Sequence, residues 1–304
     1  MDTFLDTNTI VRNANKAGIA IPAFNIPYLP MIKPIIQAIS EQDCYAIIEV
    51  ARIEWKKLES KSLQAVYQEF IKWNKFESIR LHLDHVPVID EDNQKVDYLA
   101  IIQKAIDIGY QSVMVDGSRL NFEENINATK LAVDMAHCAG IACEAELGAV
   151  LGHEESPLPP YEELFSSGQG FTKIDEAKMF VNKTRCDWLS VAIGNIHGSV
   201  SVAERDKKKI QARLNLEHLQ QLNDTLKIPL VLHGGSGIQQ EYILEAFKRG
   251  ISKINIATEI RQPYEVAIKH SGSLLEAQKA VYQRTSSLLK GFFLLSGTKQ
   301  LILD

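Results

Sequence analysis

Short apolar runs alternate with amphipathic segments along the chain. The apolar runs are typical of buried strands and cover residues 19–25, 45–51, 78–84, 111–116, 141–147, 187–194, 229–233 and 251–257. Segments with helical spacing of apolar residues separate them, including 31–42, 96–108, 123–139, 176–182, 216–226 and 242–248. This alternation predicts βα units whose strands form a parallel sheet.

The number of predicted units fits one closed barrel. Eight strands and their helices within 304 residues match the size of a (β/α)₈ TIM barrel. We expect one domain over 1–304, with an extra N-terminal helix (residues 3–16) closing the barrel bottom and a C-terminal helical tail (274–294). A doubly wound sheet is the alternative fold, but no linker or low-complexity tract divides the chain into two halves.

Three predicted loops after strands are longer than the roughly 2–6 residues usual for such connections. They span 86–95, 148–172 and 198–214. Loops that follow the strands of a parallel barrel lie on the rim where ligands bind. Glycines in the second loop favour a mobile lid, which we expect to cover a site on that rim.

The charge, apolar runs and cysteines of the chain indicate which partners and which cell compartment to expect. The net charge of −5 at pH 7 gives no support for nucleic-acid binding, and Lys207–Lys209 is expected to be a solvated loop. No apolar run approaches the roughly 18 residues that a membrane helix needs. The first residues lack the features of a secretion signal, and the four cysteines form no Cys-x-x-Cys pair. We therefore expect a soluble, cytoplasmic protein with free thiols.

Three of the predicted strands carry a histidine at or just beyond the carboxyl end: His85, His197 and His233. In a parallel barrel these positions meet at one rim. Three imidazoles there would hold a divalent metal and leave one coordination position open, as in catalytic zinc sites. A rim histidine with ordinary hydrogen-bond partners is the alternative for any one of them.

Acidic residues accompany these histidines. Asp84 precedes His85, and adjacent side chains in a regular strand point to opposite faces. We therefore expect the strand to end at Asp84, so that His85 turns over the rim. Glu144 and Glu146 share one face of another strand, and a carboxylate inside a barrel is costly unless it is paired or binds a metal. An ion pair with a lysine such as Lys253 is the alternative for one of them.

The last two predicted strands end in residues suited to an anion. Strand 229–233 continues into Gly234-Gly-Ser-Gly237, and strand 251–257 contains Asn255, three residues before Thr258. Loops after these two strands are the usual phosphate site of such barrels, and glycine lets the backbone approach the anion closely. A tight turn without a ligand is the alternative for the glycine-rich segment.

Taken together, these segments resemble the class II, zinc-dependent fructose-bisphosphate and tagatose-bisphosphate aldolases. The matching segments run in family order and are Pro22–Asn25, His82–His85, Ser112–Ser118, Glu144–Gly148, Val191–Gly198, Val231–Gly237 and Lys253–Glu259. Each segment alone is a weak signal, whereas the ordered set is specific.

The resemblance implies roles for the matching residues. The metal ligands would be His85, His197 and His233, joined by Asp116 and Glu146 in an alternate, more buried metal position. Asp84 would be the acid/base at the acceptor aldehyde oxygen, and Glu154 in the lid would remove the proton next to the ketone. The residues implied in substrate binding are Asn25, Gly198, Gly234, Ser236, Asn255 and Thr258. A monovalent cation, Na⁺ or K⁺, is expected near the phosphate.

By the same resemblance, the protein is expected to be an aldolase of carbohydrate metabolism, such as glycolysis, that acts on a phosphorylated ketose. Zn²⁺ would act as a Lewis acid and stabilise the enediolate of dihydroxyacetone phosphate, so no lysine Schiff base is needed. The alternatives are a Schiff base on Lys253, a zinc-dependent hydrolase on the same barrel, and a non-catalytic sugar-phosphate-binding protein. The resemblance also implies a homodimer or homotetramer.

Two positions depart from the family pattern, and both concern the substrate. Ser201 stands where family members commonly have a lysine that touches the donor phosphate. Arg52 follows strand 45–51, where the family usually has small residues. We hypothesise that Arg52 contacts an anionic end of the acceptor or donor. An ion pair on the surface is the alternative.

Overall fold

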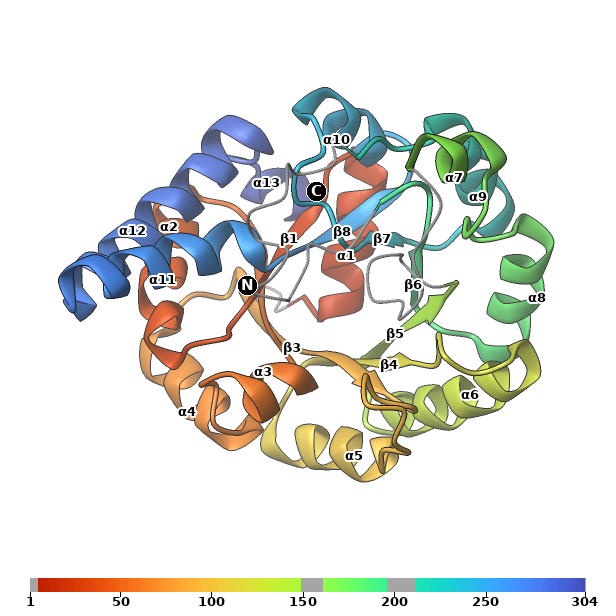
Figure 1. Ribbon diagram of the computed structural model, residues 1–304, viewed down its shortest axis with the longest axis horizontal. Coiled ribbons are helices and arrows are strands. Elements are labelled where there is room, and N and C mark those ends of the chain that lie inside the picture. Colours follow the sequence, from red (N-terminus) through yellow and green to blue (C-terminus); the bar gives the residue numbers. More distant parts are fainter. Residues whose placement is uncertain (1–4, 149–160, 196–211, 304) are drawn as a thin grey trace.

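Eight parallel strands close into a barrel in sequence order, with helices around the outside (Figure 1). The computed structural model describes residues 5–148, 161–195 and 212–303. The strands are β1 (Ile21–Asn25), β2 (Ala46–Ala51), β3 (Ile79–Pro87), β4 (Ser112–Asp116), β5 (Ala142–Leu147), β6 (Trp188–Val191), β7 (Leu230–Leu232) and β8 (Ile251–Ile256). The predicted TIM barrel is therefore confirmed.

The helices occupy the segments between these strands and the two ends of the chain. They are α1 (Thr7–Ala17), η1 (Leu29–Met31), α2 (Ile32–Glu41), α3 (Arg52–Lys57), α4 (Leu63–Trp73), α5 (Tyr98–Ile108), α6 (Phe122–Cys138), α7 (Tyr161–Ser167), α8 (Ile174–Thr184), α9 (Leu216–Leu226), α10 (Gln240–Phe247), α11 (Thr258–Ser271), α12 (Leu274–Ser287), η3 (Leu288–Phe292) and α13 (Lys299–Leu303). In the described ranges, none of them is long and apolar enough to cross a membrane.

Helix α1 closes the amino-terminal end of the barrel, as predicted for residues 3–16. Asp6 caps it by accepting a hydrogen bond from the Thr9 backbone N–H at 2.8 Å, and Gly18 ends it with a φ of 66°. Its apolar face packs on the barrel floor, where Trp188 is fully buried. The predicted C-terminal tail is also present, as α12 followed by the π-helical turn η3.

The barrel interior changes from apolar to charged toward the carboxyl ends of the strands. Alternate residues of a strand face the same side, so Ala142, Glu144 and Glu146 follow one another from floor to rim along β5. Ala142 belongs to the apolar floor, whereas Glu144 and Lys253 of β8 have no exposed surface and form an ion pair. A layer of charged side chains that includes Glu144 and Lys253 therefore lies directly beneath the rim.

The predicted lid is only partly described. Its second half contains α7, which the apolar pattern does not predict. Tyr161, the first residue of α7, donates a hydrogen bond to the carbonyl of Gly194 at 3.1 Å and so joins this helix to the loop after β6. Residues 149–160 of the same loop lie outside the described residues.

Candidate active site

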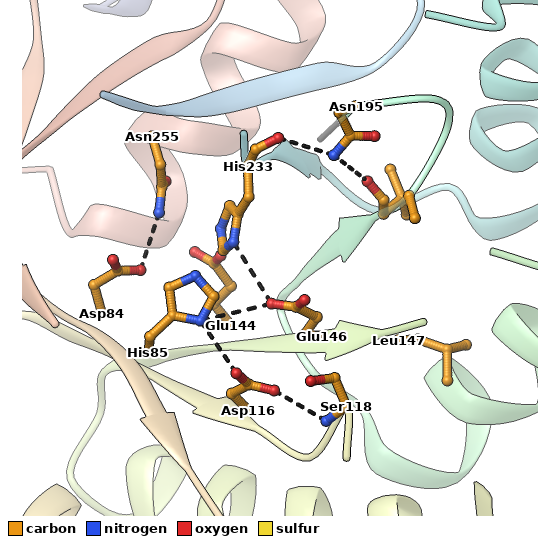
Figure 2. Close-up of polar contacts among 12 residues, drawn as sticks. Asp84, His85, Asp116, Ser118, Glu144, Glu146, Leu147, Asn195, His233 and Asn255 are labelled. Atoms are coloured by element: carbon orange, nitrogen blue, oxygen red, sulfur yellow. Dashed lines mark hydrogen bonds and ion pairs between the residues drawn. The ribbon is translucent and has the colours of Figure 1, made fainter. Parts of the chain in front are cut away.

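Predicted site residues from four strands meet at the carboxyl ends of the barrel (Figure 2). Asp84 and His85 lie near the end of β3, and Asp116 is the last residue of β4. Glu146 lies on β5, and His233 follows β7 directly. This rim is where parallel barrels bind their ligands, so the location agrees with a catalytic role.

An irregularity in β3 turns two consecutive side chains toward the site. The register with β4 shifts between Leu83 and Val86, which places Asp84 and His85 together opposite a single residue of β4. His85 has a φ of 32°, a value that residues other than glycine rarely adopt. The prediction that the strand ends at Asp84 is wrong, because β3 continues to Pro87 and a bulge redirects His85 instead.

Two of the three predicted imidazole ligands lie side by side. The ring centroids of His85 and His233 are 4.6 Å apart, and one ligand atom from each of these rings lies within 4.8 Å of a carboxylate oxygen of Asp84. A second group with the same spacing consists of His85, Asp116 and Glu146. These two donor sets adjoin and share His85, and a third, fully buried group of Glu49, His82 and Asp84 shares Asp84 with the first.

Buried carboxylates make positive charge favourable in the site. Burial alone would lower the pKa of His85, but Asp84 and the other nearby carboxylates outweigh it and hold that pKa well above its ordinary value. Burial also opposes the charged form of His233, yet its contacts with Glu144 and Glu146 raise its pKa to about 9. The carboxylates therefore favour cations at both imidazole positions.

These donors fit a divalent cation. Imidazole nitrogens and carboxylate oxygens are ligands of Zn²⁺ and related ions. Glu146 Oε2 is buried and makes no hydrogen bond of normal geometry with the described residues. It lies 3.7 Å from His85 Nδ1 and 3.5 Å from His233 Nδ1. A cation among these atoms would give this buried carboxylate oxygen a closer partner than either imidazole.

Asp84 is held by two asparagine side chains. Asn25 Nδ2 donates to Asp84 Oδ2 at 2.9 Å, and Asn255 Nδ2 donates to Asp84 Oδ1 at 3.0 Å. Lys253 Nζ in turn donates to Asn255 Oδ1 at 2.6 Å. Asp84 is 1% exposed, so these amides fix the orientation of a buried carboxylate.

Glu144, which lies beneath the rim, orients His233. Glu144 Oε1 lies 2.9 Å from His233 Nε2, which leaves Nδ1 facing Glu146. Glu144 also forms an ion pair with Lys253 at 3.0 Å, which is the alternative that the sequence suggests for one of the two glutamates. Glu49 Oε2 lies 3.0 Å from the same ammonium group.

Lys253 is not poised to act as a nucleophile. Burial would lower its pKa, but Glu144 and Glu49 outweigh burial and raise the pKa above that of a solvated lysine. A Schiff base requires a neutral amine, so this environment disfavours the Schiff-base alternative.

Comparison with known proteins identifies the family. The model of the family described as class-II fructose-bisphosphate aldolase matches residues 5–292. The chain belongs to the class II aldolase family. This match and the aldolase structures below make it an aldehyde-lyase, as the sequence predicts.

Solved structures of aldolases resemble this class II aldolase over nearly its whole length. The YdjI aldolase from Escherichia coli K12 is 30% identical, with a TM-score of 0.74 and coverage of 97% of this chain and 99% of that one. A putative fructose-1,6-biphosphate aldolase from Coccidioides immitis is 25% identical, with a TM-score of 0.75 and coverage of 96% of both chains. A fructose-bisphosphate aldolase from Campylobacter jejuni, 18% identical over 95% and 94%, shares the fold with a TM-score of 0.74.

The predicted phosphate loops of this class II aldolase lie next to each other. Gly234 has a φ of 65°, a conformation that glycine adopts readily, and Thr258 begins α11. Ser236 Oγ donates to Glu259 Oε1 at 2.9 Å. Ser236, Asn255 and Thr258 all line one cavity between these loops and α12.

Arg52 begins α3 and forms an ion pair. Its Nη1 lies 3.3 Å from Asp90 Oδ2, and the two side chains are 15% and 9% exposed. This is the ion pair that the sequence offers as the alternative to substrate contact, although both partners are more buried than a typical surface pair. Contact between Arg52 and an anionic substrate stays a prediction.

Sequence reasoning missed Glu54, which lies near the acid/base. Glu54 Oε2 accepts a hydrogen bond from the Ala51 backbone N–H at 2.8 Å and is 5% exposed. Burial raises the pKa of Glu54 well above its ordinary value, and the nearby negative charge of Asp84 acts in the same direction. A glutamate three residues after a strand end is the only sequence signal for this arrangement.

Several predicted residues lie outside the described residues. They are Glu154 of the lid, His197, Gly198, Ser201 and the basic run Lys207–Lys209. What the sequence predicts for each of them stays a prediction.

Proposed function

We propose that this class II aldolase uses a divalent metal, with Zn²⁺ as the candidate, to cleave or form a carbon–carbon bond in a phosphorylated ketose. Dihydroxyacetone phosphate is the proposed shared product. The observation that carries the proposal is the convergence of His85, His233 and Asp84, because it joins a metal site to an acid/base group. His197 is the proposed third imidazole ligand, and Asp116 and Glu146 would hold the alternate metal position.

The chain's own groups supply the proton transfers. When bound, the cation supplies Lewis-acid polarisation of the ketone oxygen. In cleavage, Asp84 removes the proton from the hydroxyl on the carbon that becomes the aldehyde, and the electron pair of the breaking bond passes to the donor carbon. In condensation, Asp84 returns the proton to the aldehyde oxygen. Glu154 is proposed to move the proton at the carbon next to the ketone.

The hydrogen bonds around Asp84 support this role. Asn25 and Asn255 hold one carboxylate oxygen each, so Asp84 keeps its orientation before substrate arrives. Pre-organisation of this kind lowers the cost of reaching the reacting geometry. The same asparagines are proposed to donate to substrate oxygens once the substrate is bound.

The donor phosphate is proposed to bind between the loops after β7 and β8. Ser236 and Thr258 line the cavity there and each offers a hydroxyl, Gly234 precedes this lining with a φ of 65°, and the start of α11 favours an anion. Gly198 and a monovalent cation, Na⁺ or K⁺, are proposed to complete this site. We further propose a homodimer or homotetramer that works in the cytoplasm.

A substrate panel tests the proposal. Zinc-loaded protein would be mixed with fructose 1,6-bisphosphate, tagatose 1,6-bisphosphate and related ketose 1-phosphates, and release of dihydroxyacetone phosphate would be followed with a coupled dehydrogenase. We expect release from at least one ketose phosphate and a loss of about 100-fold or more in the Asp84→Asn variant. The absence of release from every ketose phosphate, or an Asp84→Asn variant as active as the native enzyme, would refute it.

A further inference from the structure

The cavity beside the proposed phosphate loop has a charged wall. It has a volume of about 160 Å³ and lies between the loop after β7, the start of α11 and α12. Its ionisable side chains are Glu259 and Arg284, which lie close to Ser236. The rest of the lining is largely apolar and includes Ile254, Ile256, Leu288, Phe292 and Phe293.

Three side chains from three elements form a chain of contacts along this wall. Ser236 Oγ donates to Glu259 Oε1 at 2.9 Å. Arg284 Nη2 donates to Glu259 Oε2 in a close ion pair. The side chains of Arg284 and Glu259 are 38% and 28% exposed, so water weakens but does not remove the interaction of their charges. Glu259 is thus an anion to which the loop's hydroxyl already donates.

This arrangement creates a competition. A serine hydroxyl has a single proton to donate, and Ser236 donates it to Glu259. A phosphate bound to the loop needs the same proton and is repelled by the nearby carboxylate. The first turn of α11 favours an anion in general, so the helix does not discriminate between the carboxylate and a phosphate.

We propose that Glu259 is a built-in competitor of the substrate phosphate and that Arg284 weakens this competition by holding and neutralising Glu259. The inference rests on the proposed function, because it takes the phosphate of the donor to bind at Ser236. When the phosphate binds, Ser236 turns its proton to a phosphate oxygen and Arg284 retains Glu259. Arg284 is therefore a positioning residue that sets affinity for the phosphorylated donor through Glu259.

Two single variants should change the affinity for the phosphate in opposite directions. The double variant shows which of the two residues acts through the other. Arg284→Ala removes the cation that pairs with Glu259 in the structure, so Glu259 should hold Ser236 and repel the phosphate more strongly, and the Kd for dihydroxyacetone phosphate should rise about tenfold. Glu259→Gln keeps the shape but removes the charge, so that Kd should fall about threefold or more. The double variant should bind like Glu259→Gln, because Arg284 has no role once the competing charge is gone.

Calorimetry on the full-length, metal-loaded protein measures these effects without turnover. The probes are dihydroxyacetone phosphate, inorganic phosphate and unphosphorylated dihydroxyacetone. The Kd for unphosphorylated dihydroxyacetone should change less than twofold in every variant. Arg249→Ala is the matched control, since it breaks an ion pair of similar exposure with Glu245 on α10. If Arg284→Ala folds poorly, Arg284→Lys replaces it: this variant keeps the charge, so its Kd for dihydroxyacetone phosphate should rise by less than about tenfold.

The outcomes separate the inference from the proposed function. A double variant as weak as Arg284→Ala would mean that Arg284 binds the phosphate directly, and the inference would be wrong. Equal losses for dihydroxyacetone and its phosphate, or equal losses in the Arg249→Ala control, would indicate a general structural role and overturn it as well. If the native protein bound neither phosphate probe, the proposed phosphate site itself would fail, and the inference with it.

Discussion

Two glutamates contact the same lysine, but replacing each with glutamine should have different effects on stability and on zinc affinity. Glu49 and Glu144 each place an oxygen 3.0 Å from Lys253 Nζ, and all three side chains have no exposed surface. Only Glu144 also contacts His233, through Nε2 at 2.9 Å. Replacing either glutamate with glutamine keeps its size and leaves a side chain that is neutral at every pH. The pair therefore isolates the effect of the charge at each position.

The expected magnitudes follow from the charge states. Burial and Asp84 raise the pKa of Glu49 to about 8, so at pH 7 it is mostly neutral and Glu49→Gln should be at least as stable as the native protein. Burial opposes ionisation of Glu144, but Lys253 and His233 outweigh it and hold its pKa at about 2. Glu144→Gln therefore breaks a buried ion pair, at a cost of about 3–5 kcal/mol, and should weaken metal binding about 10–100-fold.

The pH dependence provides a second test of Glu49. Its folded pKa of about 8 lies above that of a solvated glutamate, so the folded state binds the proton more tightly than the unfolded state. Native stability from this group is therefore greatest at low pH and falls by up to about 1.4 kcal/mol per unit as the pH rises toward 8. Glu49→Gln lacks this loss, so its advantage over the native protein should grow between pH 5 and pH 7.5.

Urea unfolding at these two pH values, together with zinc affinity from competition with a chelating dye, measures both effects. We expect Glu144→Gln to lose stability and zinc affinity, and Glu49→Gln to keep both. Equal destabilisation by the two substitutions, or a stability difference between Glu49→Gln and the native protein that does not change with pH, would refute the assigned charge states.

Three further predictions concern residues around the acid/base. Asn25→Ala removes one of the two amides that hold Asp84, so kcat should fall about tenfold or more while zinc content stays the same; a change confined to KM would contradict this role. Arg52→Ala should raise KM about tenfold for substrates with a second anionic group, and unchanged kinetics would leave only the ion pair with Asp90. Glu54→Ala leaves a buried backbone N–H without its acceptor, so urea unfolding should show a loss of about 1–3 kcal/mol, whereas native stability would disprove this.

The barrel could be predicted because its strands are buried on both faces. Such strands appear in the sequence as short continuous apolar runs, and β7 between Pro229 and His233 is a clear example. The end of β3 was predicted wrongly, since a bulge changes the register without changing the alternation of residue types around it. The helix α7 was missed because it is short and contributes only Leu164 to the core.

The site could be predicted in part, because strand ends converge in any parallel barrel. Asp84, His85 and His233 follow from that rule together with their sequence motifs. The partnership of Glu49 with Lys253 could not be predicted, because it joins β2 to β8 across the barrel interior and leaves no local pattern. Such contacts depend on closure of the sheet, which brings together residues that are distant in sequence.

The proposed aldol cleavage depends on a requirement for a metal held by the rim histidines. Its most direct test is a zinc titration of chelator-treated protein, in which release of dihydroxyacetone phosphate from an active ketose phosphate is the readout. We expect no activity without metal, recovery that saturates at about one zinc per chain, and no recovery in His233→Ala. His137→Ala is the matched control, because His137 pairs with Asp187 away from the rim and should behave like the native protein. Activity that survives metal removal, or a His233→Ala variant that recovers like the native enzyme, would contradict the claim.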